Sequence, residues 1–142
     1  MRAFEKDISK IAYLVVQLWP DNSLNEAEDI LKEYFSGEET AVFIHEIREK
    51  YVGLALCGLR HDYVEGCETS PVGYLEGIVV DSEYRNQGIA RTLCEECEAW
   101  AKEQGCTEFA SDCELTNTES LRFHMRLGFQ EENRIICFKK TI

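Results

Sequence analysis

The sequence of 142 residues predicts an α/β protein in which a central mixed β-sheet is flanked by helices. Two observations support this fold class: apolar residues switch between helical spacing and strand-like runs along the chain, and strands alternate with helices after an early hairpin. The predicted order is α-α-β-β-β-α-β-α-β. At this length we expect one domain spanning residues 1–142.

Two helices are expected first. Residues 8–19 carry apolar side chains at helical spacing, with Asp7 available as the N-cap. Ser23 followed by Glu26 forms a capping box before a second helix, and Gly37 is its expected end.

Three strands are expected next. Residues 41–47 and 51–60 are rich in β-forming residues and flank the charged segment 48–50, which is typical of a hairpin turn. After a loop over residues 62–72, residues 73–80 are apolar almost throughout, which favours a strand covered on both faces.

In the second half of the chain, segments with helical spacing of apolar residues alternate with strand-like segments. Helical spacing recurs over residues 88–104 and stops at Gly105. A short strand over residues 108–113 and a helix over residues 117–127 follow, and residues 129–140 are expected to form a closing strand.

The composition limits the classes of partner. Lys and Arg number 15 and Asp and Glu number 27, which gives a formal net charge of −12, while 44% of the residues are hydrophobic. The chain is therefore expected to fold rather than behave as an acidic disordered tail. A surface of this charge repels a phosphate backbone, so we expect no nucleic-acid partner, and it attracts cations.

The sequence also limits the compartment. No segment approaches the roughly 18 apolar residues of a membrane span, and the charged start lacks the apolar core of a secretory signal. The seven cysteines are odd in number and follow no disulfide framework, which favours reduced thiols. We therefore expect a cytoplasmic protein with no membrane partner.

One segment has the composition of an anion-binding turn. A buried strand leads through a short loop into a helix that opens at Gly88, where Arg85, Gly88 and Ala90 form the pattern R-x-x-G-x-A. Small residues let a ligand approach the backbone, and the free amides of a first helical turn favour a pyrophosphate. An ordinary tight turn with a glycine would look the same. Neither a Walker A loop nor a Rossmann fingerprint is present.

Glu76 is anomalous within the apolar run 73–80, because the residues on both faces of that strand are apolar. A carboxylate buried without a partner is costly. The side chain must therefore face solvent, pair with an arginine or border a cleft.

Together with Arg85, Gly88 and Ala90, a second set of residues resembles the GNAT superfamily of N-acetyltransferases. The acetyl-CoA motif of that superfamily is Q/R-x-x-G-x-G/A after the central strand. Its second motif begins with an asparagine and ends in Gly-Phe, and Asn117, Ser120, His124 and residues 128–129 fit that spacing. The order of helices and strands agrees from end to end.

The resemblance implies acetyl-CoA as co-substrate and no metal. It assigns the pyrophosphate to the segment that starts at Arg85, with the amides of Asn86, Gln87, Gly88, Ile89, Ala90 and Arg91. It also implies that the backbone of Ile78, Val79 and Val80 runs alongside the pantetheine arm, with one N–H polarising the thioester carbonyl. Asn117 would lie near the cofactor.

The resemblance narrows to aminoglycoside 6′-N-acetyltransferases, which implies acetyl transfer to the 6′-amine of a cationic antibiotic by direct attack, and hence resistance. It rests on residues 18–20, 60–66, 69–71, 75–78 and 110–112, several of which are polar or in loops. In that subfamily the positions of Trp19, Tyr63, Glu76 and Asp112 line the acceptor pocket.

Each of these residues also has a structural interpretation. Glu76 would hold the substrate ammonium and help to remove its proton, with Asp112 as a second carboxylate. Asp112 could instead terminate its strand for turn reasons. Trp19 is otherwise a core residue at a helix end, and Tyr63 a loop aromatic; the resemblance favours stacking on a sugar ring.

Two positions depart from the family pattern. His124 stands where many of these enzymes have a tyrosine that protonates the departing thiolate, so it either serves as that acid or only packs at the cofactor. Asn133 stands where the subfamily often has a glutamate facing the acceptor. Glu131 or Glu132 could substitute, although strand alternation would direct a neighbour to the other face.

The sequence also allows alternative interpretations of its cysteines, its acceptor and its activity. Cys94 and Cys97 form a C-x-x-C, but inside an amphipathic helix this favours core packing over zinc. The chain could acetylate another amine, such as a polyamine or a protein lysine, or be a catalytically silent CoA-binding module. Relatives of this type pair as homodimers, and the last strand is the expected interface.

Overall fold

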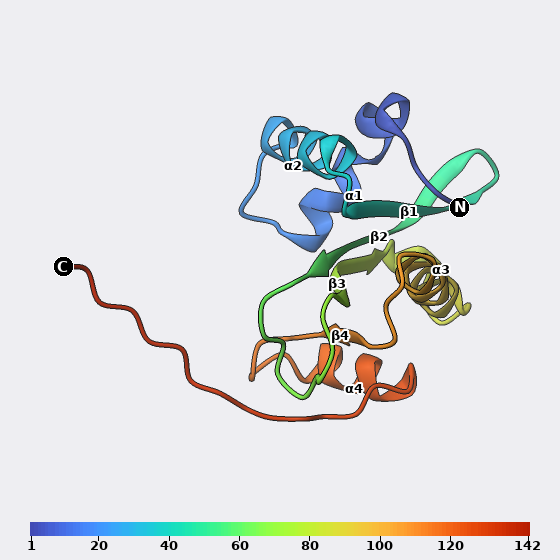
Figure 1. Ribbon diagram of the computed structural model, residues 1–142. Helices are drawn as coiled ribbons and strands as arrows, with labels where there is room; N and C mark the ends of the chain where they lie inside the picture. The colour runs from blue at the N-terminus through green and yellow to red at the C-terminus, as the bar shows by residue number, and fades with distance from the viewer.

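The computed structural model describes residues 1–142 and contains the predicted mixed sheet, in the order β1-β2-β3-β4. The antiparallel strands are β1 (Thr40–Ile47), β2 (Lys50–Arg60) and β3 (Val72–Val80), and β4 (Phe109–Ser111) lies parallel to β3. Figure 1 shows the sheet between two layers of helices.

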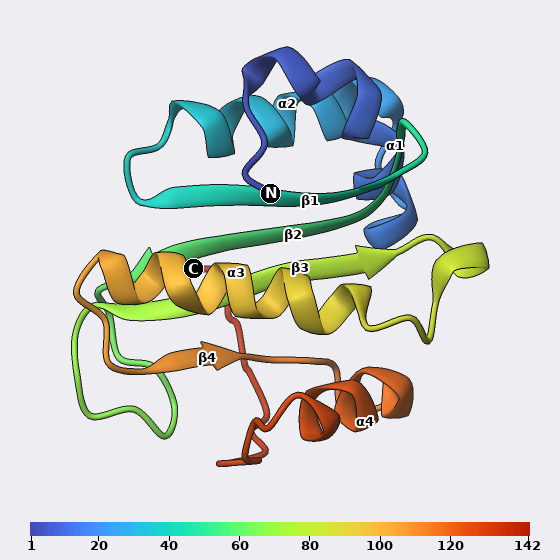
Figure 2. The ribbon, with the colours of Figure 1, turned by 90° about the vertical axis from the view of Figure 1, so that its right-hand side faces the viewer.

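Helices cover both faces of the sheet. α1 (Ile8–Leu18) and α2 (Leu24–Ser36) pack on one face, α3 (Ile89–Glu103) packs on the other, and α4 (Thr118–Arg126) follows β4 (Figures 1 and 2). Because side chains alternate along a strand, β1 contributes to two separate apolar clusters. This double cover explains why the central strands are apolar almost throughout.

The N-termini of the first two helices differ in their capping. Ser23 and Glu26 form the predicted capping box: Ser23 Oγ accepts from the Glu26 N–H at 3.1 Å, and Glu26 Oε2 accepts from the Ser23 N–H at 2.7 Å. Asp7 stands at the predicted N-cap position of α1, but its side chain makes no capping hydrogen bond there. A short 3₁₀ turn (Glu5–Asp7) precedes the helix, and the Asp7 carboxylate instead accepts from the Phe4 N–H at 3.0 Å.

β3 and β4 pair over only a short distance. Gly73, Tyr74 and Leu75 pair with Phe109, Ala110 and Ser111, and beyond them the two strands separate. The predicted strand over residues 108–113 is therefore longer than the observed one. Figure 2 shows β3 continuing past the end of β4.

The predicted closing strand over residues 129–140 is wrong. The segment after Phe129 forms no strand and leaves the rest of the fold as an extended, exposed chain (Figure 1, red). Its residues make no backbone hydrogen bond to any strand of the sheet. A strand exists only where a neighbouring edge completes its ladder, and β-propensity alone does not supply one.

None of the helices combines the length and the apolar composition that a bilayer span requires.

Gly73 fixes the packing of α3 on β3. A Cβ at this position would stand 2.5 Å from the Ala101 Cβ and 2.7 Å from the Phe109 ring. We expect Gly73→Ala to lower the free energy of unfolding by about 1–3 kcal/mol, measured by urea denaturation, because the core has no room for the methyl group.

A matched control is the double variant Gly73→Ala with Ala101→Gly, which removes the opposing Cβ. We expect it to be less destabilised than the sum of the two single variants. An unchanged urea midpoint for Gly73→Ala would contradict this packing.

Candidate active site

Glu76 lies on a β-bulge. In the pairing of β2 with β3, Leu56 lies opposite Gly77 and Cys57 lies opposite Leu75, so Glu76 has no partner residue in β2. A bulge redirects the side chain of the extra residue and bends the strand. The polar residue in this apolar strand is therefore the one that the regular ladder does not include.

The Glu76 carboxylate is paired with an arginine, one of the three environments expected from the sequence. Arg60 Nε donates to Glu76 Oε1 at 3.0 Å, and Arg60 Nη2 donates to Glu76 Oε2 at 2.8 Å. The Glu76 side chain is 26% exposed and that of Arg60 43% exposed. This bidentate pair joins the end of β2 to the bulge in β3.

The same guanidinium connects Glu76 to Asp112. Arg60 Cζ lies 3.4 Å from the centre of the Tyr74 ring, and the Tyr74 hydroxyl donates to Asp112 Oδ2. Burial raises the pKa of Tyr74, and the hydrogen bond to the Asp112 carboxylate raises it further, so the hydroxyl keeps its proton and acts as the donor. Two strands, β2 and β3, and the residue that follows β4 thus contribute to one cluster of charged and polar groups.

Of the two predicted aromatic site residues, Trp19 lies at the bulge and Tyr63 lies away from it. A Cβ on Gly77 would stand 3.1 Å from Trp19 Cζ2, so the Trp19 indole lies directly against the bulge. Tyr63 is 78% exposed and makes no hydrogen bond, and the structure does not bring it to the other site residues. Asn133 Nδ2 donates to Glu65 Oε1 at 2.7 Å, so Asn133 holds a carboxylate of the loop that carries Tyr63.

The loop before α3 presents its backbone. Asn86 and Gly88 have positive φ angles of 61° and 78°, which turn the chain sharply into the helix. The first amide of α3 with an acceptor is that of Thr92, which donates to the Gly88 carbonyl at 3.1 Å. No atom lies within 4 Å of a Cβ built on Gly88. The preceding amides, from Asn86 to Arg91, therefore have no acceptor within the protein, and the chain is open at Gly88, as binding of an anion requires.

The arginine side chains of this loop point to the protein itself. Arg85 Nε donates to the Val80 carbonyl at 3.3 Å, and its Nη1 lies 3.5 Å from Glu119 Oε1. Arg91 Nη2 donates to the Arg126 carbonyl at 2.7 Å and so ties α3 to α4. The backbone, more than these side chains, is what the loop offers to a ligand.

The separation of β3 from β4 leaves a free strand edge. From Glu76 to Val80 the side of β3 that faces β4 has no ladder partner, because β3 pairs with β2 on its other side only. An extended chain with amide groups can pair with such an edge. The edge leads directly to the free amides of the loop, so the two together fit an elongated ligand in which an amide-bearing arm is followed by a pyrophosphate, as in CoA.

His124 lies where β3 and β4 separate. Its Nδ1 lies 2.7 Å from the Ser120 carbonyl oxygen, which can only accept, so Nδ1 carries a proton. Nε2 lies 2.8 Å from Ser111 Oγ, which in turn lies 3.2 Å from the Leu75 carbonyl oxygen. The Ser111 hydroxyl has one proton for these two neighbours. The hydrogen bonds from imidazole through Ser111 to Leu75 are complete only when Nε2 is also protonated.

Asn117 is the N-cap of α4: its Oδ1 accepts a hydrogen bond from the Ser120 N–H at 3.0 Å. It thereby fixes the helix that carries His124.

The C-x-x-C pair of α3 supplies no nucleophile to this site. Cys94 and Cys97 are buried in the core beneath α3, as the sequence predicts. Burial raises the pKa of the Cys94 thiol to about 12, which keeps it protonated and unreactive.

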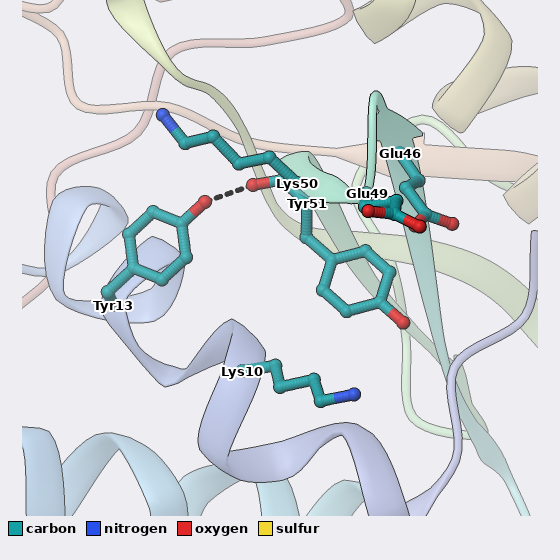
Figure 3. A pocket seen from close by; sticks show the side chains of 6 residues that line it. All are labelled: Lys10, Tyr13, Glu46, Glu49, Lys50 and Tyr51. Atoms are coloured by element: carbon teal, nitrogen blue, oxygen red, sulfur yellow. Dashed lines mark hydrogen bonds between the residues drawn. The ribbon is translucent and has the colours of Figure 1, made fainter.

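A separate surface pocket of about 600 Å³ lies between α1 and the turn from β1 to β2. Lys10, Tyr13, Glu46, Glu49, Lys50 and Tyr51 line it (Figure 3). None of the predicted site residues belongs to it, and the Tyr13 hydroxyl inside it donates to the Tyr51 carbonyl. It is therefore not the place where the strand edge, the loop and the carboxylates meet.

Sequence reasoning missed Arg60 and Tyr74 as site residues. Arg60 is 16 positions from Glu76, and Tyr74 is 38 positions from Asp112, so only the strand pairing brings them together. The one available signal was the anomalous Glu76, for which an arginine partner was one of the expected environments.

Comparisons with known proteins identify the family of this chain. The acetyltransferase (GNAT) family model matches residues 4–129. The chain is 40% identical over 126 residues to an aminoglycoside N(6′)-acetyltransferase type 1 of Serratia marcescens, covering 88% of this chain and 86% of that protein.

Two solved structures have the same fold. The aminoglycoside N-acetyltransferase AAC(6′)-Iy in complex with CoA superposes with a TM-score of 0.95 at 34% identity, covering 99% of this chain and 93% of that one. AAC(6′)-Iy in complex with a bisubstrate analogue of CoA and acetylneamine gives a TM-score of 0.94 at 34% identity, covering 100% and 97%. By sequence and by fold, this chain belongs to the GNAT family of acetyltransferases.

Proposed function

We propose that this protein is an aminoglycoside 6′-N-acetyltransferase that transfers acetyl from acetyl-CoA directly to the 6′-amine of the antibiotic. The observation that carries the proposal is the bulge in β3, which sets the Glu76 carboxylate next to the free strand edge and, through Arg60 and Tyr74, next to Asp112. The similarity to aminoglycoside acetyltransferases over most of the chain supports the substrate class. The acceptor is a polycation, which suits a protein with a net charge of −12.

The residues for acetyl-CoA are those of the loop and the free edge. The amides from Asn86 to Arg91 would bind the pyrophosphate, aided by the positive end of the α3 dipole. The exposed backbone of Ile78, Val79 and Val80 would pair with the pantetheine arm. Acetyl-CoA supplies an activated acyl group, and an N–H of this edge would stabilise negative charge that develops on the carbonyl oxygen.

The residues for the acceptor are the two carboxylates and Trp19. Glu76 and Asp112 would bind ammonium groups, and Trp19, which lies against the bulge, would support a sugar ring. Glu76 would then remove the proton of the attacking amine, directly or through water. Tyr63 is exposed on its loop and would contact the acceptor only at the outer edge of the proposed site.

His124 is the proposed acid for the departing thiolate. It lies at the point where the strands separate, and its protonated form completes the hydrogen bonds through Ser111 to Leu75. The opposite tautomer is blocked by the Ser120 carbonyl. Asn117 acts on this residue indirectly, because it caps α4.

We also propose that the protein is a cytoplasmic homodimer. Ile136 and Phe138 on the segment after Phe129 are 80% and 91% exposed, and the outer edge of β4 is unpaired. Apolar side chains on an extended segment and an open sheet edge together suit exchange of this segment with a second copy. The free thiols suit a reducing compartment.

The first prediction concerns the acceptor. In a thiol-release assay with acetyl-CoA, we expect turnover with neamine and none with its 6′-hydroxyl counterpart, because only the former has the 6′-amine. Preference for spermidine or a lysine peptide would contradict the proposed substrate, and no release with any amine would indicate a silent CoA-binding module.

The second prediction concerns the carboxylates. We expect Glu76→Gln to lower kcat/KM for neamine about 100-fold or more, because the variant loses the proton acceptor. Asp112→Asn should cost roughly tenfold through one charge-assisted contact. Calorimetry should find acetyl-CoA affinity unchanged in both variants, whereas parallel loss of that affinity would place these side chains at the cofactor.

The third prediction concerns assembly. Light scattering should give the mass of a dimer for the full chain and of a monomer after removal of residues 130–142. The double variant Ile136→Glu, Phe138→Glu is the matched control that keeps the chain length, and we expect it to be monomeric as well, since it removes the apolar contacts. A full chain that is monomeric at micromolar concentration would refute the dimer.

A further inference from the structure

Arg60 is the one cation within the cluster of Glu76, Tyr74 and Asp112. It ends β2, immediately before the loop that carries Tyr63, and both of its hydrogen bonds go to Glu76. A guanidinium that binds a carboxylate through two parallel N–H groups fixes the carboxylate plane as well as its position. Arg60 therefore determines where both Glu76 oxygens lie.

The Tyr74 ring extends this control to Asp112. The guanidinium lies flat enough to approach the ring centre to 3.4 Å, and the same ring donates its hydroxyl proton to Asp112. Tyr74 is only 5% exposed, so the ring has a fixed position under the guanidinium. Arg60 thus contacts one carboxylate directly and is one side chain away from the other.

Stability does not account for this arrangement. Ion pairs with partly exposed partners contribute little to folding, and the Glu76 side chain is accessible enough to be hydrated without Arg60. Each carboxylate oxygen that accepts from Arg60 retains a second lone pair. With one cation and two carboxylates, the cluster has a net charge of −1 and can accept one ammonium group.

We propose that Arg60 is a positioning residue for acetyl transfer, which holds Glu76 and, through Tyr74, Asp112 in the geometry that receives the acceptor amine. This inference rests on the proposed function, because it assumes that the two carboxylates bind the acceptor. Arg60 does not itself touch the reacting atoms. It sets the orientation of Glu76 and leaves the remaining lone pairs for the substrate.

The test compares four variants: Arg60→Met, Arg60→Lys, Tyr74→Phe and, as a remote control, Lys32→Met. Lys32 forms an exposed ion pair with Asp29 on α2. The readouts are kcat and KM for neamine, KM for acetyl-CoA, and calorimetric binding of neamine in the presence of CoA. Thermal unfolding of each variant checks that it folds.

We expect Arg60→Met to lower kcat/KM for neamine roughly 10- to 100-fold, the range for a lost pair of charge-assisted hydrogen bonds, with KM for acetyl-CoA unchanged. Arg60→Lys keeps the charge but cannot form the bidentate pair, so its kcat/KM should lie between that of Arg60→Met and that of the wild type. Tyr74→Phe keeps the ring under Arg60 and should weaken neamine binding through Asp112 alone. Lys32→Met should behave as the wild type.

A double-variant cycle separates positioning from general effects. Because Arg60 contacts Glu76 directly and Asp112 only through Tyr74, Arg60→Met should cost much less in the Glu76→Gln background than in the wild type. Additive losses, full activity of Arg60→Lys, or a lower KM for neamine in Arg60→Met would each overturn the inference. The last result would mean that Arg60 competes with the substrate.

The wild-type protein distinguishes failure of the proposed function from failure of the role of Arg60. If the wild type acetylates another amine in the panel, the same variants are measured with that amine, and the role of Arg60 is judged there. If the wild type neither acetylates nor binds any amine, the proposed function and the role of Arg60 are both refuted.

Discussion

The central constraint in this fold is that β3 must pair with two neighbours that diverge. β2 stays paired with β3 along nearly its whole length, whereas β4 stays only for the three residues from Gly73 to Leu75. The other features of the site follow from this separation. It frees the edge of β3, and it places Ser111 and His124 at the point of divergence. The bulge at Glu76 begins where the pairing with β4 ends.

The regular elements could be predicted from the sequence because their signals are local. Helical spacing, the capping box at Ser23 and the apolar run of β3 gave the helices and strands with only small errors at the ends. The amide-rich loop could also be anticipated, because its pattern is contained within a few residues from Arg85 to Ala90. The family resemblance supplied the candidate carboxylates, and the structure brings Glu76 and Asp112 into one cluster.

The remaining features depend on contacts between distant residues. A bulge is a property of two paired strands, so residues 73–80 alone mark Glu76 as anomalous but do not say that it lies outside the ladder. The contacts of Arg60 with Glu76 and Tyr74 arise from the same pairing. The closing segment was misjudged for a related reason: its β-propensity is real, but within one chain no sheet edge receives it. Asp7 stands at the N-cap of α1 without a capping hydrogen bond, because its carboxylate accepts from the Phe4 N–H in the 3₁₀ turn that precedes the helix.

The way in which the loop before α3 meets its ligand has a consequence for inhibition. The anion site proposed there is made of peptide N–H groups, while the side chains of Arg85 and Arg91 are engaged with Val80, Glu119 and Arg126. A point mutation changes side chains but leaves the peptide group in place. A blocker whose affinity came from a phosphate-like group at these amides would therefore offer few routes to escape by substitution, in contrast to one that relied on the side chains of Glu76 and Asp112.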